Sequence, residues 1–217
     1  MRILCLAAHP DDETLGVGGT LARHAADGDA LTLVVATRAT APRGSEAVSA
    51  EKRRECLAAA TRLGIDDVRF LDFPTMHLNA LPAIDVNDAV AREIERARPQ
   101  VVYAPPCDDL NRDHAVIFDA ALVATRPLGG REAPTLYSYE IPTTTRFNLA
   151  SRWTANTYVD ISDFVETKLA AMREYASELR PSPHPRSEES IRVFGRERGA
   201  AVGLGCAEAL MLVRALR

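Results

Sequence analysis

Short apolar runs alternate with longer amphipathic segments along most of this chain. The runs have the length and the aliphatic content of buried strands. They cover residues 3–8, 31–36, 68–73, 101–104, 135–141 and 157–161. The segments with helical patterns cover 14–28, 47–63, 84–98, 115–125, 163–178 and 188–203. The last apolar stretch, 205–216, fits either a helix turn or a strand. Strands joined by helical crossovers predict an α/β fold with a Rossmann-like, mostly parallel sheet flanked by helices.

Composition agrees with this class. The chain has 217 residues, 47% hydrophobic and 26% charged, which suits a single domain over 1–217 with a sizeable core. A net charge of −4 and a pI near 5.8 give no broad basic surface for nucleic acid or an anionic membrane. No stretch approaches the length of a membrane span. Four widely spaced cysteines without a CxxC motif predict a reduced, cytoplasmic protein.

Polar residues of the metal-binding type follow the first apolar run directly, in the sequence HPDDE. Ligands of open α/β sheets bind outside the carboxyl ends of the strands, so we expect a metal site there. His9 and Asp12 are three residues apart around a turn and can converge on one zinc ion. Asp11 must point elsewhere, where it suits a general base. The alternative is an acidic helix start, favoured by capping and by the helix dipole.

A second polar cluster, PPCDDLNRDH, follows the apolar run at 101–104 and opens the helical segment at 115–125. It occupies the same position relative to a strand as the first cluster. His114 is therefore the best candidate for a third metal ligand. Asp113 precedes it, and a carboxylate beside a ligating imidazole can orient or tune that imidazole.

These motifs resemble those of the PIG-L/LmbE-like N-acetylglucosaminyl deacetylase family. AHPDDE after a first strand is similar to the family's first motif, and NRDH is similar to the asparagine version of its second motif. DFPTMHLN and PHPRS look most like segments of small bacterial members. The resemblance covers nearly the whole chain. It implies a metal-dependent, usually zinc-dependent, hydrolase on a Rossmann-like sheet, with His9 and Asp12 as metal ligands and Asp11 as the general base.

Asn111 departs from the better-known members, in which a histidine at this position is assigned to the oxyanion or to general acid catalysis. An asparagine can donate a hydrogen bond to an oxyanion but cannot deliver a proton. The leaving amine then takes its proton from Asp11 or from another histidine, and the sequence leaves both open. His184, in the PHPRS segment, is a candidate for that proton donor or for a substrate contact. An ordinary surface linker is the alternative.

Three further residues are candidates for substrate binding. Members of the family often carry a substrate-contacting arginine early in the helix at 47–63, and Arg53 is the candidate here, with a solvated basic face as the alternative. Asp72 ends the run at 68–73, where a turn or cap role is the alternative. His77 follows in the next loop, near the predicted rim.

The predicted activity is hydrolysis of the N-acetyl group of an N-acetylglucosamine-type amino sugar or sugar conjugate. His9, Asp12 and His114 hold one Zn²⁺ per chain in this hypothesis, although Fe²⁺ or another divalent ion also suits the donor set. One alternative keeps the metal and cleaves a different acyl group or a thiol-sugar conjugate. Another is an α/β ligand-binding protein whose acids only cap a helix. Dinucleotide binding is disfavoured because acids in the first loop repel a pyrophosphate. The expected partner is a small molecule, and a homo-oligomer is possible.

Overall fold

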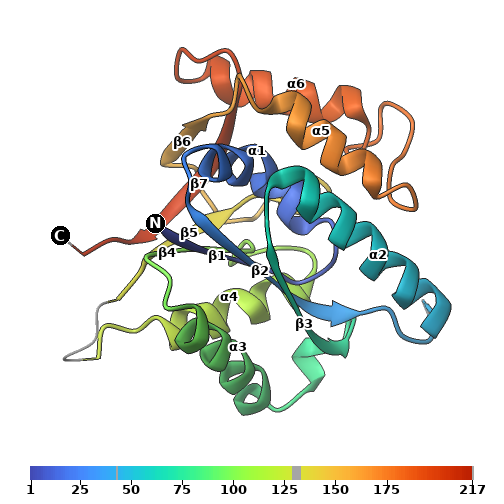
Figure 1. Cartoon of the computed structure of the whole chain (residues 1–217), viewed down its shortest axis with the longest axis vertical. Coiled ribbons are helices and arrows are strands. Elements are labelled where there is room, and N and C mark those ends of the chain that lie inside the picture. The colour runs from blue at the N-terminus through green and yellow to red at the C-terminus, as the bar shows by residue number, and fades with distance from the viewer. Residues whose placement is uncertain (43, 129–132, 217) are drawn as a thin grey trace.

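The computed structural model describes residues 1–42, 44–128 and 133–216. These residues form a seven-stranded sheet in the order β3-β2-β1-β4-β5-β7-β6, with helices on both faces (Figure 1). The strands are β1 (Arg2–Ala7), β2 (Ala30–Arg38), β3 (Asp67–Pro74), β4 (Val101–Ala104), β5 (Thr135–Tyr139), β6 (Thr157–Asp160) and β7 (Ala207–Arg214). The helices are α1 (Asp12–Ala26), α2 (Glu46–Leu63), α3 (Ala83–Ala97), α4 (Arg112–Ala124), α5 (Val165–Glu174) and α6 (Glu188–Ala200), with short 3₁₀ turns η1 (Leu78–Ala80) and η2 (Thr145–Phe147).

The first five strands are parallel, and β7 runs antiparallel to both β5 and β6. This confirms the predicted mostly parallel α/β fold. The ambiguous stretch at 205–216 is a strand: β7 lies between β5 and β6, and Leu210 pairs with Tyr139 on one side and Thr157 on the other. Within the described residues, no helix is both long and apolar enough to cross a membrane.

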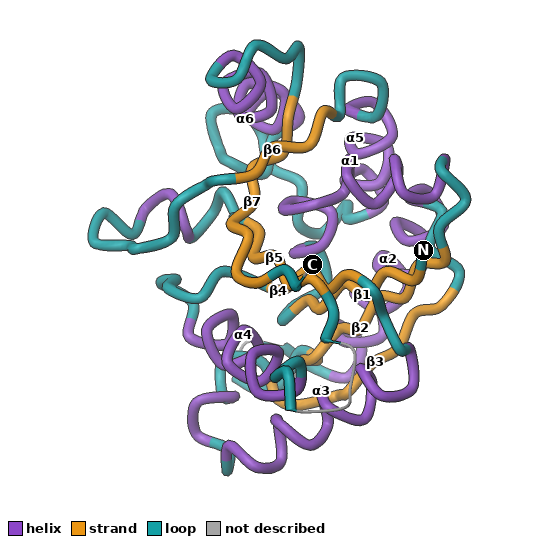
Figure 2. Tube along the Cα trace, turned by 90° about the vertical axis from the view of Figure 1, so that its left-hand side faces the viewer, coloured by secondary structure: helices purple, strands orange, loops and turns teal. Residues whose placement is uncertain are grey.

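The sheet separates two hydrophobic cores. Alternate residues of β1 point to opposite faces, as the period of a strand requires. Ile3 and Cys5 join the core under α1, α2 and α5, whereas Leu4 and Leu6 join the core under α3 and α4. Figure 2 shows the sheet between these two groups of helices. Burial on both faces explains why the strands read as continuous apolar runs.

Helix α1 lies unusually close to the sheet because two of its positions are glycine. A Cβ atom on Gly16 would lie 2.2 Å from a ring carbon of Tyr139, and one on Gly19 would lie 2.8 Å from Ile161. The Tyr139 hydroxyl in turn donates a hydrogen bond of 2.8 Å to the carbonyl of Leu6 in β1. The glycines that follow HPDDE therefore serve packing, because they let α1 lie against Tyr139 of β5 and against Ile161.

The strand order reverses direction between β1 and β4. From β1 the chain proceeds outward through β2 and β3, and it returns to the other side of β1 for β4 and β5. Loops that leave the carboxyl ends of β1 and β4 diverge at such a switch point and leave a crevice between them. Both polar clusters of the sequence, at 9–13 and 105–114, lie at this point.

Candidate metal centre

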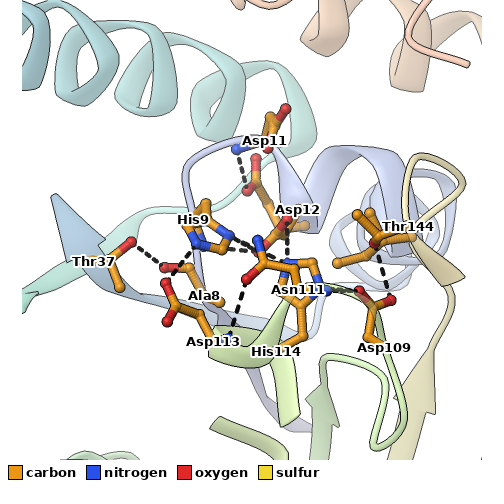
Figure 3. Close-up of polar contacts among 12 residues, drawn as sticks. Ala8, His9, Asp11, Asp12, Thr37, Asp109, Asn111, Asp113, His114 and Thr144 are labelled. Carbon is orange, nitrogen blue, oxygen red and sulfur yellow. Dashed lines mark hydrogen bonds and ion pairs between the residues drawn. The ribbon is translucent and has the colours of Figure 1, made fainter. Parts of the chain in front are cut away.

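Three side chains bring their donor atoms together at the end of β1 and the start of α4 (Figure 3). One donor atom each from His9, Asp12 and His114 lies within 4.8 Å of the other two. His9 Nδ1 is 3.2 Å from His114 Nε2. Asp12 Oδ2 lies 3.4 Å from His9 Nδ1, and Asp12 Oδ1 lies 3.4 Å from His114 Nε2. The structure thus groups the three residues predicted to be metal ligands.

The outer nitrogens of both imidazoles face other carboxylates. His9 Nε2 lies 3.0 Å from Asp113 Oδ2, and His114 Nδ1 lies 3.1 Å from Asp109 Oδ1. A proton held on each outer nitrogen leaves a lone pair on each inner nitrogen. Once a cation displaces the inner protons, the two inward lone pairs and the Asp12 carboxylate make a set of three acceptors, which is the chemistry of a zinc site. The residues present therefore fit a divalent cation.

Charges in this group favour a bound cation. Burial lowers the pKa of His9, but the carboxylates of Asp12 and Asp113 outweigh it and bring that pKa to about 10. Burial is likewise outweighed at His114, whose pKa rises to about 9 beside Asp12 and Asp109. Burial alone would raise the pKa of Asp12, yet the two imidazoles hold it well below its usual range. A group that attracts protons this strongly also attracts a metal ion, which competes with those protons.

Asp11 turns away from the ligand group. It is the N-cap residue of α1, but its side chain makes no capping hydrogen bond. Its φ is 103°, in the left-handed region that costs a non-glycine residue about 1–3 kcal/mol. This backbone sends the Asp11 and Asp12 carboxyls in different directions (Figure 3). Burial raises the pKa of Asp11 to about 7, and the Arg186 guanidinium limits that rise.

Asp113 contacts His9, a predicted ligand from the first polar cluster. The sequence predicts instead that Asp113 orients its neighbour His114. Successive helix positions point about 100° apart, so adjacent side chains do not meet. Its carboxylate also accepts the N–H groups of Met76 (2.6 Å) and Leu78 (3.1 Å), which fixes it to the loop after β3. Asp113 therefore orients His9.

Asp109 takes the role that the sequence assigns to Asp113, and sequence reasoning missed it. Its Oδ1 faces His114, and its Oδ2 accepts hydrogen bonds from the hydroxyls of Thr144 (3.0 Å) and Thr145 (2.8 Å). Asp109 is fully buried. The only signal in the sequence is its place in the same acidic run as His114, five residues earlier.

Asn111 is the N-cap residue of α4. Its side-chain oxygen accepts a 3.1 Å hydrogen bond from the N–H of Asp113. With its oxygen used in this bond, the amide has its NH₂ group free to face the cavity, whose wall includes Asn111. Figure 3 shows the amide beside the two imidazoles. The residue that replaces the family's histidine therefore has a structural role as well as a place in the site.

A cavity of about 260 Å³ lies over this group. Its wall includes His9, Asp11, Asn111, Thr144, Lys52 and Arg186. Ligand cavities are typically ~300–1,000 Å³, so this one has room for a single small unit.

The other four predicted site residues do not line this cavity. Arg53 and Asp72 form an ion pair of 2.6 Å with each other, half exposed. His77 is exposed and its Nδ1 lies 2.7 Å from the carbonyl of Thr75. His184 is exposed too, and its Nδ1 accepts the N–H of Arg186. A substrate or proton-donor role for these four residues stays a prediction.

The family model of GlcNAc-PI de-N-acetylase, PIG-L, matches residues 4–125, more than half of the chain. The chain belongs to the PIG-L family. The matched region holds the three grouped donors together with Asp11 and Asn111. Arg186 lies outside it.

One relative is the 1D-myo-inositol 2-acetamido-2-deoxy-alpha-D-glucopyranoside deacetylase of Streptomyces griseus. It is 34% identical over 168 residues, which cover 61% of this chain and 52% of that protein. The chain spans about half the length of the first curated relatives it matches. This PIG-L protein therefore shares a part, and not the whole, of those longer enzymes.

Two solved structures share the fold. The conserved protein TT1542 from Thermus thermophilus has a TM-score of 0.80 at 29% identity, with 100% of this chain and 96% of that chain covered. GalB, the 4-carboxy-2-hydroxymuconate hydratase of Pseudomonas putida KT2440, has a TM-score of 0.77 at 24% identity, with 100% and 98% covered. The second likeness concerns the fold alone, and it shows that one architecture serves more than one reaction.

Proposed function

We propose that this PIG-L protein is a metal-dependent hydrolase that removes the N-acetyl group of an N-acetylglucosamine-type amino sugar or sugar conjugate. One observation carries the proposal: a His-Asp-His donor group and a separate buried carboxylate, Asp11, open onto the same cavity. An amide hydrolase that activates water needs both parts, an electrophile for the carbonyl and a base for the water. The name of the Streptomyces relative, an N-acetyl sugar deacetylase, supports the same reaction class.

His9 Nδ1, Asp12 and His114 Nε2 would hold the cation, and zinc suits this donor set best. When bound, zinc polarises an acetamide carbonyl and lowers the pKa of water. The chain's own part is to keep both imidazoles in the right orientation. Asp113 does this for His9, and Asp109 does it for His114.

Asp11 would move the proton. Its carboxylate takes a proton from water as the water oxygen attacks the acetamide carbon. The same carboxyl then returns that proton to the nitrogen as the C–N bond breaks, so that acetate and a free amine leave. A pKa near 7 suits a group that must accept and release a proton at neutral pH. Asn111 donates a hydrogen bond from its amide to the developing oxyanion. Because an amide supplies no proton, Asp11 serves as both base and acid.

The cavity supports a substrate with one sugar ring in the site. Its volume of about 260 Å³ suits a monosaccharide unit, and its wall offers hydroxyl and amide groups from Thr144 and Asn111 for the sugar hydroxyls. A conjugate attached to that ring would extend through the mouth. A small-molecule sugar is therefore the proposed partner.

Acetate release is the test. The chain is purified without chelator, and its metal content is measured. Loaded and stripped protein are then compared on N-acetylglucosamine and a panel of its conjugates. We expect one zinc per chain and acetate only with the loaded protein. Protein that binds one zinc and releases no acetate from any N-acetyl sugar would contradict the deacetylase. Equal release by loaded and stripped protein would contradict the metal-dependent reaction.

A further inference from the structure

A segment outside the matched family region reaches the catalytic carboxylate. Residues 181–187 form the last part of the connection from α5 to α6, and Arg186 of this segment lines the cavity. Arg186 Nε lies 2.9 Å from Asp11 Oδ2, and Arg186 Nη1 lies 3.2 Å from Glu178 Oε2. Only 27% of the Arg186 side chain is exposed, and Asp11 is fully buried. The charge pair is thus at the inner wall of the cavity.

The segment fixes the backbone from which Arg186 projects. The Arg186 N–H donates to His184 Nδ1 at 3.1 Å, and the Ser187 N–H donates to the His184 carbonyl at 2.8 Å. The Ser187 hydroxyl then accepts the N–H of Ser190 at 3.0 Å and caps α6. Arg186 therefore stands between a tight turn and a capped helix start. His184, for which the sequence leaves a functional role and a surface linker both open, supports this turn.

Two more charged side chains, Glu178 and Lys52, continue the ion pairs on the other side of the Arg186 guanidinium. Glu178 forms ion pairs with both Arg186 and Lys52, which comes from α2. Negative and positive side chains therefore alternate from Asp11 through Arg186 and Glu178 to Lys52. An arginine fork held at two of its nitrogens keeps a fixed direction, which a flexible lysine would not do as well.

We propose that Arg186 is a positioning residue that holds the Asp11 carboxylate toward the cavity, beside the metal ligands. Among the described residues, no hydrogen bond of ordinary geometry reaches Asp11 Oδ2, so the ion pair with Arg186 is the contact that fixes its rotation. The left-handed backbone of Asp11 frees its side chain from a capping role. The consequence for turnover rests on the proposed function, whereas the pairing itself does not.

The first test measures the pairing without any substrate. The thermal midpoint of metal-free protein is compared for Asp11→Asn, Arg186→Gln and the double variant. Arg186→Gln leaves a buried carboxylate without its cation, so we expect the midpoint to fall by about 4 °C. In the Asp11→Asn background, Arg186→Gln should lower the thermal midpoint by less than half as much. An equal loss in both backgrounds would overturn the pairing.

The second test measures turnover of the metal-loaded protein. Misplacing a reacting group by about 1 Å can cost roughly 100-fold, so we expect Arg186→Gln to lower kcat by about 10- to 100-fold, with KM within about twofold. Arg186→Lys should restore part of the lost kcat, because it returns the charge without the fork. A rise in KM at unchanged kcat would overturn the positioning role and make Arg186 a substrate contact.

Arg180→Gln is the matched control. Arg180 flanks the same segment, is exposed, and donates its Nη1 hydrogen bonds to the backbone carbonyls of Ser177 and Leu179. We expect its kcat to match that of the parent protein. Wild-type protein that binds zinc but turns over no N-acetyl sugar would refute the proposed function, and the thermal coupling would still decide whether Arg186 holds Asp11.

Discussion

At the scale of single residues, the site depends on how each imidazole is turned. Both histidines present one nitrogen to the shared point and the other to a buried carboxylate, Asp113 for His9 and Asp109 for His114. Such partners fix the tautomer and the ring orientation of a metal ligand. Asp109 has a second function, because its other oxygen holds the hydroxyls of Thr144 and Thr145. Asp109 therefore links the orientation of the His114 ring to the position of the segment that carries Thr144 and Thr145.

Asp109→Asn should weaken zinc binding. The amide keeps the shape but loses the negative charge that keeps the proton on His114 Nδ1, so we expect the dissociation constant to rise about tenfold, up to 100-fold. Competition with a chromophoric chelator measures it. Asp108→Asn is the control, since Asp108 contacts the 148–152 loop and not the imidazoles. Unchanged zinc affinity in Asp109→Asn would show that Asp109 does not support the ligand.

Some site residues can be predicted from the sequence, and others cannot. Residues that lie next to a strand end within one motif, such as His9 and Asp12, can be grouped from their spacing. The partners of these residues cannot, because they arrive from other elements. Asp113 meets His9 across the switch point, and Arg186 meets Asp11 from a segment 175 residues later in the sequence. Local spacing holds no information on such contacts.

At the scale of elements, an ion cluster ties the segment after β5 to α6. Glu140 accepts hydrogen bonds from Arg198 at 2.7 and 2.9 Å and from Arg146 at 3.2 Å. The Arg146 guanidinium also stacks on the ring of Phe194, 4.3 Å from its centre. This cluster anchors the segment that carries Thr144 and Thr145 against Asp109. Elements outside the ligand group thereby shape its rim.

Glu140→Gln should destabilise the protein at neutral pH. Burial alone would raise the pKa of Glu140, but Arg198 and Arg146 hold it below the usual range. A carboxyl with a depressed folded pKa contributes stability above its unfolded pKa, about 4.3, and loses that contribution as the pH falls through the folded pKa. We expect the free energy of unfolding at pH 7 to fall by about 3 kcal/mol, because both guanidiniums lose the buried carboxylate that they share.

The measurement is chemical denaturation of Glu140→Gln and the parent protein between about pH 3 and pH 7, a range that spans the unfolded pKa of ~4.3. The difference in unfolding free energy between the two proteins should shrink as the pH falls toward about 3. Glu189→Gln on the exposed face of α6 is the control and should change little. A difference that stays constant with pH would mean that the charge of Glu140 is not what stabilises the cluster.

At the scale of the whole molecule, the sheet order explains why one site forms from two distant clusters. β1 and β4 are neighbours, so the loops at 8–11 and 105–111 leave the sheet side by side. The alternating pattern of strands and helices predicts the mostly parallel α/β sheet, because each βαβ unit has its own periodicity, but it does not predict the strand order. The pattern does not predict that β7 is a strand. Its apolar run is buried between β5 and β6, and burial of this kind does not distinguish a strand from a helix turn.

The role of Asp11 as the proton carrier is tested by acetate release from zinc-loaded Asp11→Asn beside the parent protein, with the zinc content of both determined. We expect the variant to keep one zinc per chain, because Asp11 is not one of the three grouped donors. Its turnover should fall by about 100- to 10,000-fold, the usual contribution of a general acid–base group, because an amide cannot take the proton from water. Undiminished acetate release by the zinc-loaded variant would show that Asp11 does not carry the proton, and loss of the zinc together with the activity would show that Asp11 helps to hold the metal.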